Sequence, residues 1–281
     1  YPPSTVVISP TMRCNLNCYG CYAGDYKKSL ELSLDEIDSV LNQMKEMGVY
    51  FAVISGGEPF YMDGIFEIFK KHSDMAFLVF THGGLIDELM VEKLIEVGNV
   101  MPAISLEGYE KETDERRGVG HFKKVMHAMD LLRNAGLSFC GSFTLSRKNT
   151  HIINDPAYVD MLLSKGVFAM WLFSYVPVGR NPDPQLMPTP EQRDQLRRTV
   201  AELRETRPML FIDFWNDGPM ISGCMAGGRK YFHINANGDI EPCVFCHFAV
   251  DNIRKTSIRD ALASPLFRMI REKQVTHDNL L

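Results

Sequence analysis

Short runs of apolar and β-branched residues alternate with helical patterns along the chain as far as about residue 210. Each run has the length of a strand and is followed by apolar residues at helical spacing. The predicted strands are "TVVIS", "VYFAVIS", "AFLVF", "MPAISL", "LSFCGSFTLS" and "FAMWLFSYV". Six strand-plus-helix units in a row indicate parallel strands with helices outside, in an open barrel or a doubly wound sheet. We predict an α/β fold with a partial (β/α)6 TIM-like barrel.

The predicted helices have recognisable ends. "SLDEIDSVLNQMKEMG" begins with a capping box formed by Ser33 and Glu36, and "HFKKVMHAMDLLRNAG" ends at Gly136. Further helices are predicted over about residues 62–72 and 86–97, in "AYVDMLLSKG" and in "TPEQRDQLRRTVAELRE".

The alternation stops after residue 210. "GCMAGGRKYFHINANGDIEPCVFCH" is rich in glycine and turn residues, and Asn237-Gly238 predicts a tight hairpin. A helix near "SIRDALASPLFRMIREKQ" follows. We therefore predict two parts, a barrel of residues 1–210 and a small cysteine-bearing extension of residues 211–281.

The seven cysteines fall into two trios and one isolated residue, Cys140. The trios are Cys14, Cys18 and Cys21, and Cys224, Cys243 and Cys246. The visible sequence begins without the pattern of a signal peptide, which indicates a cytoplasmic protein. Clustered cysteines in such a protein favour metal or cluster ligation over disulfides. Cys140 lies in an apolar strand, where a buried, inert thiol is expected.

The composition limits the partners. The formal net charge is −5 and no basic run is present, so neither nucleic acid nor an anionic membrane surface is expected as a partner. No apolar run approaches the length of a membrane span. Small molecules or peptides are the expected substrates.

The first trio lies in the loop after the first predicted strand, and reactive groups of a parallel barrel gather at that end of the strands. A structural zinc ion takes four protein ligands, and three thiols within eight residues fit that poorly. An iron–sulfur cube accepts one thiolate per iron, so three cysteines leave one iron open for a ligand. A zinc site completed by a distant His or Asp, or three unrelated thiols, are the alternatives.

"CNLNCYGC", residues 14–21, resembles the CxxxCxxC signature of the radical S-adenosylmethionine (radical SAM) enzymes, including the aromatic Tyr19 after the second cysteine. The resemblance implies a [4Fe–4S] cluster on Cys14, Cys18 and Cys21, with SAM chelating the open iron. In that family the reduced cluster cleaves SAM to a 5′-deoxyadenosyl radical, which takes a hydrogen atom from a C–H bond.

Two segments at later strand ends resemble SAM-binding motifs of the same family. "SGGEP" resembles its GGE motif, which implies that Gly56 and Gly57 allow close backbone approach and that Glu58 binds the SAM ammonium group. "THGG" resembles a Thr-Asn-Gly segment, which implies a contact from Thr81. His82 stands where the family has asparagine, and a turn role is expected for it.

The next strand ends imply contacts to the nucleoside. "ISLEG" resembles a Ser-Leu-Asp-Gly segment, so Ser105 and Glu107 are expected to reach the ribose, Glu107 with one methylene more than the usual aspartate. "FTLSRKN" and "YVPVGRN" are also similar to family segments and imply contacts from Thr144 and Val176, the latter near adenine.

"ERRGVGHF" resembles a stretch in which an Arg-Gly pair precedes the next helix. The resemblance implies that Arg117 binds the SAM carboxylate with its planar, two-pronged donor. The alternative for Glu115, Arg116 and Arg117 is a solvated run of surface charge.

The second trio resembles a different family element. Cys224 and Cys243, with Gly238 five residues before the latter, are similar to the C…GxxxxC arrangement that opens SPASM and twitch extensions, which carry auxiliary iron–sulfur clusters. Only Cys246 follows, so at most one auxiliary cluster is expected. A Cys3His zinc site is the alternative. The fourth ligand is open among His233, His247, a substrate atom and a cysteine beyond Leu281.

The resemblance implies an enzyme that abstracts hydrogen from a small-molecule or lipid substrate held between barrel and extension, assisted by an auxiliary cluster. A flavodoxin- or ferredoxin-type protein is the expected reductant. A maturase of a ribosomally made peptide is the first alternative; such enzymes often carry a leader-binding domain before the barrel, and its absence from this sequence favours a small molecule. A non-catalytic iron–sulfur electron carrier or zinc-binding module is the alternative from another class.

Overall fold

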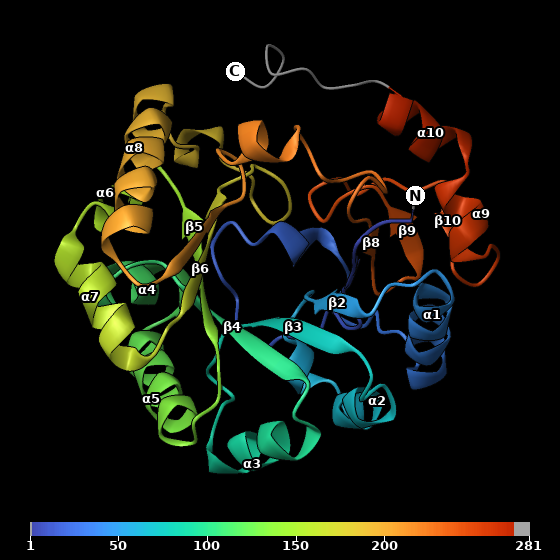
Figure 1. The fold of residues 1–281 in the computed structure, drawn as a ribbon, viewed down its shortest axis with the longest axis horizontal. Helices are drawn as coiled ribbons and strands as arrows, with labels where there is room; N and C mark the ends of the chain where they lie inside the picture. Colours follow the sequence, from blue (N-terminus) through green and yellow to red (C-terminus); the bar gives the residue numbers. More distant parts are fainter. Residues whose placement is uncertain (1, 273–281) are drawn as a thin grey trace.

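A computed structural model describes residues 2–272 of the chain (Figure 1). Within them one ten-stranded sheet runs in the order β10-β9-β8-β1-β2-β3-β4-β5-β6-β7. The strands from β1 to β7 pair in parallel, each with the next, and Figure 1 shows helices around the outside. The predicted α/β barrel is therefore confirmed. The parallel strands are β1 Val6–Ile8, β2 Phe51–Ile54, β3 Ala76–Thr81, β4 Val100–Leu106, β5 Cys140–Leu145, β6 Ala169–Ser174 and β7 Leu210–Asp213.

The parallel sheet extends one strand further than the six units predicted. β7 pairs in parallel with β6, from Ala169 opposite Leu210 to Leu172 opposite Asp213. Its four residues "LFID" are too few to give a strand pattern on their own. Because β7 begins at Leu210, it lies across the predicted boundary between residues 210 and 211. The division of the chain into these two parts stays a prediction.

The helices follow the strands as expected, with some differences at their ends. The capping box of Ser33 and Glu36 is present at α1, and a second one forms from Thr189 and Gln192 at α8. α4 and α6 were not predicted, because α4 is almost wholly polar and α6 has four residues. The helices are α1 Leu34–Glu46, α2 Ile65–Lys71, α3 Glu88–Val97, α4 Glu110–Arg117, α5 His121–Asn134, α6 Thr150–Ile153, α7 Pro156–Lys165, α8 Pro190–Thr206, α9 Ile258–Leu262 and α10 Pro265–Glu272.

Successive side chains of each strand point to opposite faces of the sheet, and this divides the core into two layers. Residues such as Ile8 and Phe143 are fully buried between sheet and helices. Their neighbours face the inside of the barrel, where Ala103, Cys140 and Ala169 form part of a second apolar layer. Small residues at these positions leave space inside the barrel. Cys140 is 1% exposed, so the predicted buried thiol is confirmed.

The extension joins the same sheet at its other edge. β8 (His233–Ile234) pairs in parallel with β1, and β9 (Asp239–Glu241) and β10 (Asp251–Asn252) continue antiparallel. The predicted hairpin is confirmed, with Gly238 at φ 80° in its turn.

The predicted C-terminal helix is divided in two. Pro265 begins α10, because its missing N–H and fixed φ end the preceding helix before it. α9 packs beside α1, where the Ile258 N–H donates to Gln43 Oε1 at 2.9 Å (Figure 1). The last two residues of the predicted helix, 273 and 274, lie outside the described residues. In residues 2–272, none of the helices combines the length and apolar character that a membrane span requires.

Candidate active site

The first cysteine loop follows β1 and is joined to the loop after β2 by backbone contacts. The Gly57 N–H donates to Thr11 O at 2.9 Å, and the Glu58 N–H donates to Arg13 O at 2.8 Å. A Cβ atom on Gly57 would overlap the Arg13 carbonyl oxygen. The close backbone approach that was predicted at the glycine pair is seen here between Gly57 and the segment that leads into Cys14.

Two basic side chains hold the cysteine loop by its carbonyl oxygens. Arg116 donates from Nε to Tyr19 O at 3.1 Å and from Nη2 to Gly20 O at 3.4 Å, and its own carbonyl accepts the Tyr19 N–H at 3.2 Å. Lys28 Nζ lies 3.3 Å from both Cys14 O and Leu16 O. Arg116 is thus more than a solvated surface charge. Sequence reasoning missed this role because the partners are backbone atoms distant in the chain.

A cavity of about 280 Å³ occupies the inside of the barrel beneath this loop. All three cysteines of the first trio line it, as do most predicted SAM contacts. The extension contributes Met225, Tyr231, Val244 and Phe245 to the same wall. The predicted contacts that line it are Gly56, Gly57, Thr81, Ser105, Arg117, Thr144 and Val176.

Glu58 lies behind the cavity wall instead of lining it. Its carboxylate is fully buried and accepts from Thr81 Oγ1 and the His82 N–H, each at 2.8 Å, and from the Phe60 N–H at 3.2 Å. Burial raises the pKa of this carboxyl to about 7. Its contact to the SAM ammonium group stays a prediction.

Glu107 and Arg117 pair with each other. Arg117 donates to Glu107 Oε1 from Nε at 2.9 Å and from Nη2 at 2.6 Å, and Arg116 Nη1 lies 2.8 Å from the same oxygen. Glu107 Oε2 is buried and has no hydrogen-bond partner within residues 2–272. Glu107 also lines a second cavity, of about 610 Å³, together with Tyr19 and Thr144. A buried acceptor without a partner is unusual, and the predicted ribose contact of Glu107 stays a prediction.

The donor set of the first trio consists of thiols only, which suits an iron–sulfur cluster. Three thiols from one loop line one cavity, and burial raises the pKa of Cys14 to about 11. In residues 2–272 no three His, Cys, Asp or Glu side chains converge where one metal ion would be held. An iron–sulfur cube takes one thiolate on each of its irons, and three thiols on one loop suit that arrangement.

His82 makes the turn contact expected of it and also a contact across the site. Its Nδ1 accepts the Gly84 N–H at 2.9 Å, so Nε2 carries the hydrogen and donates to Asn15 Oδ1 at 2.8 Å. Burial lowers the pKa of His82 to about 3, which keeps the ring neutral. Asn15 follows Cys14, so His82 supports the cysteine loop from inside the barrel.

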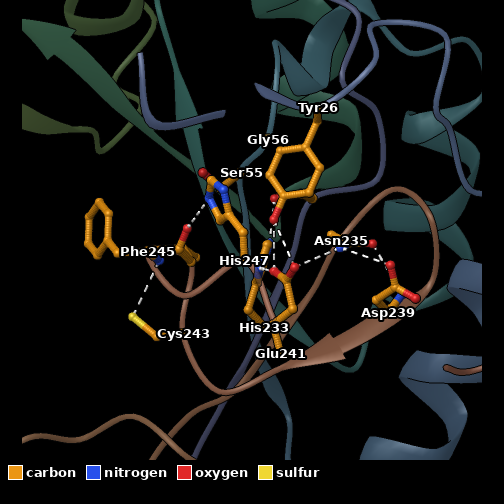
Figure 2. Close-up of polar contacts among 12 residues, drawn as sticks. Tyr26, Ser55, Gly56, His233, Asn235, Asp239, Glu241, Cys243, Phe245 and His247 are labelled. Carbon is orange, nitrogen blue, oxygen red and sulfur yellow. Dashed lines mark hydrogen bonds and ion pairs between the residues drawn. The ribbon is translucent and has the colours of Figure 1, made fainter. Parts of the chain in front are cut away.

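The second trio gathers at the hairpin of the extension. Cys243 and Cys246 face each other in an antiparallel bridge, and the Cys246 N–H donates to Cys243 O at 2.9 Å. Cys243 Sγ lies 3.0 Å from Tyr231 Oη. It also accepts the Phe245 N–H at 3.5 Å (Figure 2). Burial raises the pKa of Cys243, with a further contribution from the charges of Cys224 and Cys246.

One candidate for the fourth ligand is excluded by its contacts. His233 is fully buried, and its two ring nitrogens lie 2.7 Å from Ser9 Oγ and 2.7 Å from Glu241 Oε2. Both nitrogens are occupied, so His233 is removed from the four candidates that the sequence left open. His247 is exposed and packs its ring 4.6 Å from that of Tyr26 (Figure 2). It remains a candidate, and residues beyond Leu281 lie outside the described chain.

Comparison with known protein families identifies both parts of the chain. Residues 8–150, just over half of the chain, match the family model of the radical SAM superfamily. The chain belongs to the radical SAM superfamily. Residues 224–280 match the SPASM iron–sulfur cluster-binding domain. As a radical SAM enzyme the protein uses SAM and a [4Fe–4S] cluster, and its SPASM domain binds auxiliary iron–sulfur. The predicted family, enzyme class and cofactors are confirmed.

Curated relatives of this radical SAM enzyme differ in what they make. The AdoMet-dependent heme synthase of Methanosarcina barkeri is 25% identical, over 97% of this chain and 86% of its own. The PqqA peptide cyclase of Granulibacter bethesdensis is 26% identical, over 96% of this chain and 76% of its own.

A solved radical SAM structure shares the fold. Streptococcus suis SuiB bound to S-adenosylmethionine superposes with a TM-score of 0.80 at 20% identity, over 96% of this chain and 68% of its own. SuiB bound to its precursor peptide SuiA gives the same TM-score at 21% identity, over 96% of this chain and 66% of its own.

Proposed function

We propose that this enzyme removes a hydrogen atom from a small-molecule or lipid substrate whose apolar part enters the central cavity. When bound, the cluster and SAM supply a one-electron cleavage and a carbon radical that accepts the hydrogen atom. The residues of the chain bind and orient both partners and exclude water from the reacting carbon.

The cavity lining carries this proposal. Among the described residues that line it there is no Asp, Glu or Lys, and its two arginines, Arg116 and Arg117, lie by the cysteine loop. Aromatic rings form much of the remaining wall, so an uncharged apolar or aromatic group is the best occupant. These rings include Phe80, Trp171, Phe173, Phe214, Tyr231 and Phe245.

The roles of the site residues belong to the same proposal. Cys14, Cys18 and Cys21 hold the first cluster, and Cys224, Cys243 and Cys246 hold an auxiliary cluster. Arg117 binds the SAM carboxylate. To do so, its guanidinium must either contact Glu107 and the SAM carboxylate together or break its pair with Glu107. The other SAM contacts are Tyr19, Gly56, Gly57, Glu58, Thr81, Ser105, Glu107, Thr144 and Val176.

A peptide substrate is the second candidate, and the relatives favour it as much as a small molecule. PqqA peptide cyclase and the SuiB complex with its precursor peptide are both similar to this chain, whereas the heme synthase supports a small molecule. An apolar side chain of a peptide would enter the same cavity. In either case we expect a flavodoxin- or ferredoxin-type reductant in the cytoplasm.

Anaerobically reconstituted enzyme tests the first step. With dithionite and SAM, 5′-deoxyadenosine should accumulate, and a Cys18→Ala variant should form none. SAM that stays intact in the presence of reduced, cluster-loaded enzyme would favour the electron-carrier alternative.

Deuterium transfer then tests the substrate class. Deuterated small-molecule and lipid fractions, or deuterated peptides, are supplied in turn, and mass spectrometry measures deuterium in the 5′-deoxyadenosine formed. Transfer from the small-molecule or lipid fraction supports the proposal, and transfer from peptides alone overturns it in favour of a maturase.

A further inference from the structure

A buried polar junction lies between barrel and extension, formed by Ser9, Tyr26, His233, Asn235 and Glu241. Figure 2 shows the last four of these around the Glu241 carboxylate. The Glu241 carboxylate is 2% exposed and stands at its centre. It accepts from Tyr26 Oη at 2.8 and 3.0 Å, from Asn235 Nδ2 at 2.8 Å and from His233 Nδ1 at 2.7 Å. His233 Nε2 lies 2.7 Å from Ser9 Oγ, so one chain of hydrogen bonds spans both parts of the protein.

The members of the junction stand close in sequence to both cysteine trios. Ser9 follows β1 and precedes Cys14 by five residues, and Tyr26 follows Cys21 by five. Glu241 ends β9, two residues before Cys243. The junction therefore holds the chain on either side of the first cysteine loop against the hairpin that leads into the second trio.

The strand pairing between β8 and β1 does little by itself to determine where the extension lies against the barrel. β8 pairs with β1 at only two positions, Val7 opposite His233 and Ile8 opposite Ile234. So short a pairing has little to fix its register. In another register Glu241 would lose its hydrogen bond from Tyr26, and His233 would lose its partner Ser9. A buried polar group that loses a hydrogen-bond partner is destabilising.

We propose that Glu241 is a positioning residue, and that the buried polar junction fixes the register of β8 on β1. Through this register it sets where Cys243 and Cys246 lie relative to Cys14, a consequence that rests on the proposed function of the two trios. Tyr26 connects the barrel segment to this carboxylate directly, and His233 connects it to Ser9.

The chain offers a matched control in a second, exposed link between the same two parts. Arg254 of the extension pairs with Glu36 of α1 at 2.5 Å, with the two side chains 44% and 25% exposed. A solvent-exposed ion pair contributes little to stability. Its loss should leave the docking of the extension unchanged.

Amide hydrogen exchange on the full, reconstituted chain tests the inference without relying on activity. The Val7 N–H donates to Phe232 O at 2.9 Å and the Ser9 N–H to Ile234 O at 2.8 Å, so these two amides report on the β1–β8 pairing. In Glu241→Gln and in Tyr26→Phe their exchange should accelerate about tenfold or more, while amides of β3 to β5 exchange as in wild type. Arg254→Ala should match wild type throughout.

The spectrum and iron content of the second site provide a second readout. Both junction variants should show an altered auxiliary-cluster signal by electron paramagnetic resonance, with the signal of the first cluster unchanged. Tyr26→Phe removes a single hydroxyl and keeps the test possible if Glu241→Gln fails to fold.

Two results would overturn the inference. Wild-type exchange at Val7 and Ser9 in both variants would show that the junction does not fix the register. Equal acceleration in β3 to β5 would show that Glu241 supports only global stability. Failure of wild-type enzyme to cleave SAM would instead count against the proposed function and leave the exchange result intact.

Discussion

Arg116 donates from its guanidinium to the carbonyl oxygen of Tyr19 at 3.1 Å, so α4 holds the cysteine loop between its second and third thiols. The Tyr19 N–H returns a hydrogen bond to Arg116 O at 3.2 Å. The same guanidinium lies 2.8 Å from Glu107, so one side chain links the cysteine loop with the carboxylate that pairs with Arg117.

Replacement of Arg116 should loosen the first cluster. Arg116→Ala removes the donors to two loop carbonyls, each worth about 0.5–1.5 kcal/mol. We expect iron release to a chelator about tenfold faster than in wild type, with SAM cleavage reduced in proportion. Glu115→Ala is the control on the same helix, because Glu115 is exposed and pairs only with Lys148 at 3.5 Å among the ion pairs of the described chain. Equal iron retention in all three proteins would contradict this role.

Glu58 should make the stability of the SAM-free chain depend on pH. Burial raises its pKa from 4.5 to about 7, so between these values the folded chain binds more protons than the unfolded chain. The contribution of Glu58 to the free energy of unfolding is therefore fully present below about pH 4.5 and falls as the pH rises through 7. The total loss is at most about 3 kcal/mol.

Thermal unfolding of wild type and Glu58→Gln between pH 4.5 and 8 measures this effect. Wild type should lose stability relative to the variant as the pH rises. A constant difference between the two proteins would mean that the folded-state pKa of Glu58 is not raised.

SAM should bind more weakly to the Glu58→Gln variant while its iron content is unchanged, and calorimetry tests that affinity.

Local patterns in the sequence predicted the barrel and the members of its first cysteine site. Alternating strand and helix periods are properties of adjacent residues, as are the spacing of Cys14, Cys18 and Cys21 and the turn at Gly238. The cavity lining brings most of the predicted contacts together, because parallel strands place their carboxyl ends at one edge.

Contacts between distant segments could not be read in this way. His233 looked like a possible metal ligand because its residue type suits one, and only the fold shows that Ser9 and Glu241 occupy both ring nitrogens. His82 similarly gains its role from Asn15, which lies 67 residues earlier. The pairing of β8 with β1 joins opposite ends of the chain and left no local pattern.

Cys243 should be required for the second cluster but not for the first. Cys243→Ala is expected to remove about one cluster's worth of iron, about four atoms per chain for a cube, while the first site still cleaves SAM. Cys140→Ala is the matched control, because that thiol is buried in a strand with Met101 Sδ at 3.9 Å. Iron content equal to wild type in Cys243→Ala would show that the second trio binds no iron.

Phe245 lines the central cavity, in the loop between Cys243 and Cys246. Its ring lies 5.5 Å from that of Tyr22, the neighbour of Cys21, and 5.9 Å from that of Trp215. Truncation to alanine would remove both aromatic contacts and enlarge the cavity.

We expect Phe245→Ala to uncouple the reaction. SAM cleavage without substrate turnover should rise, and product formed per SAM cleaved should fall about tenfold, because the substrate group is held less firmly against the first site. Phe248→Ala is the control, since Phe248 lies nearby in sequence but is 56% exposed. Chromatography of 5′-deoxyadenosine and product gives the ratio, and unchanged coupling in Phe245→Ala would place the substrate elsewhere than against this ring.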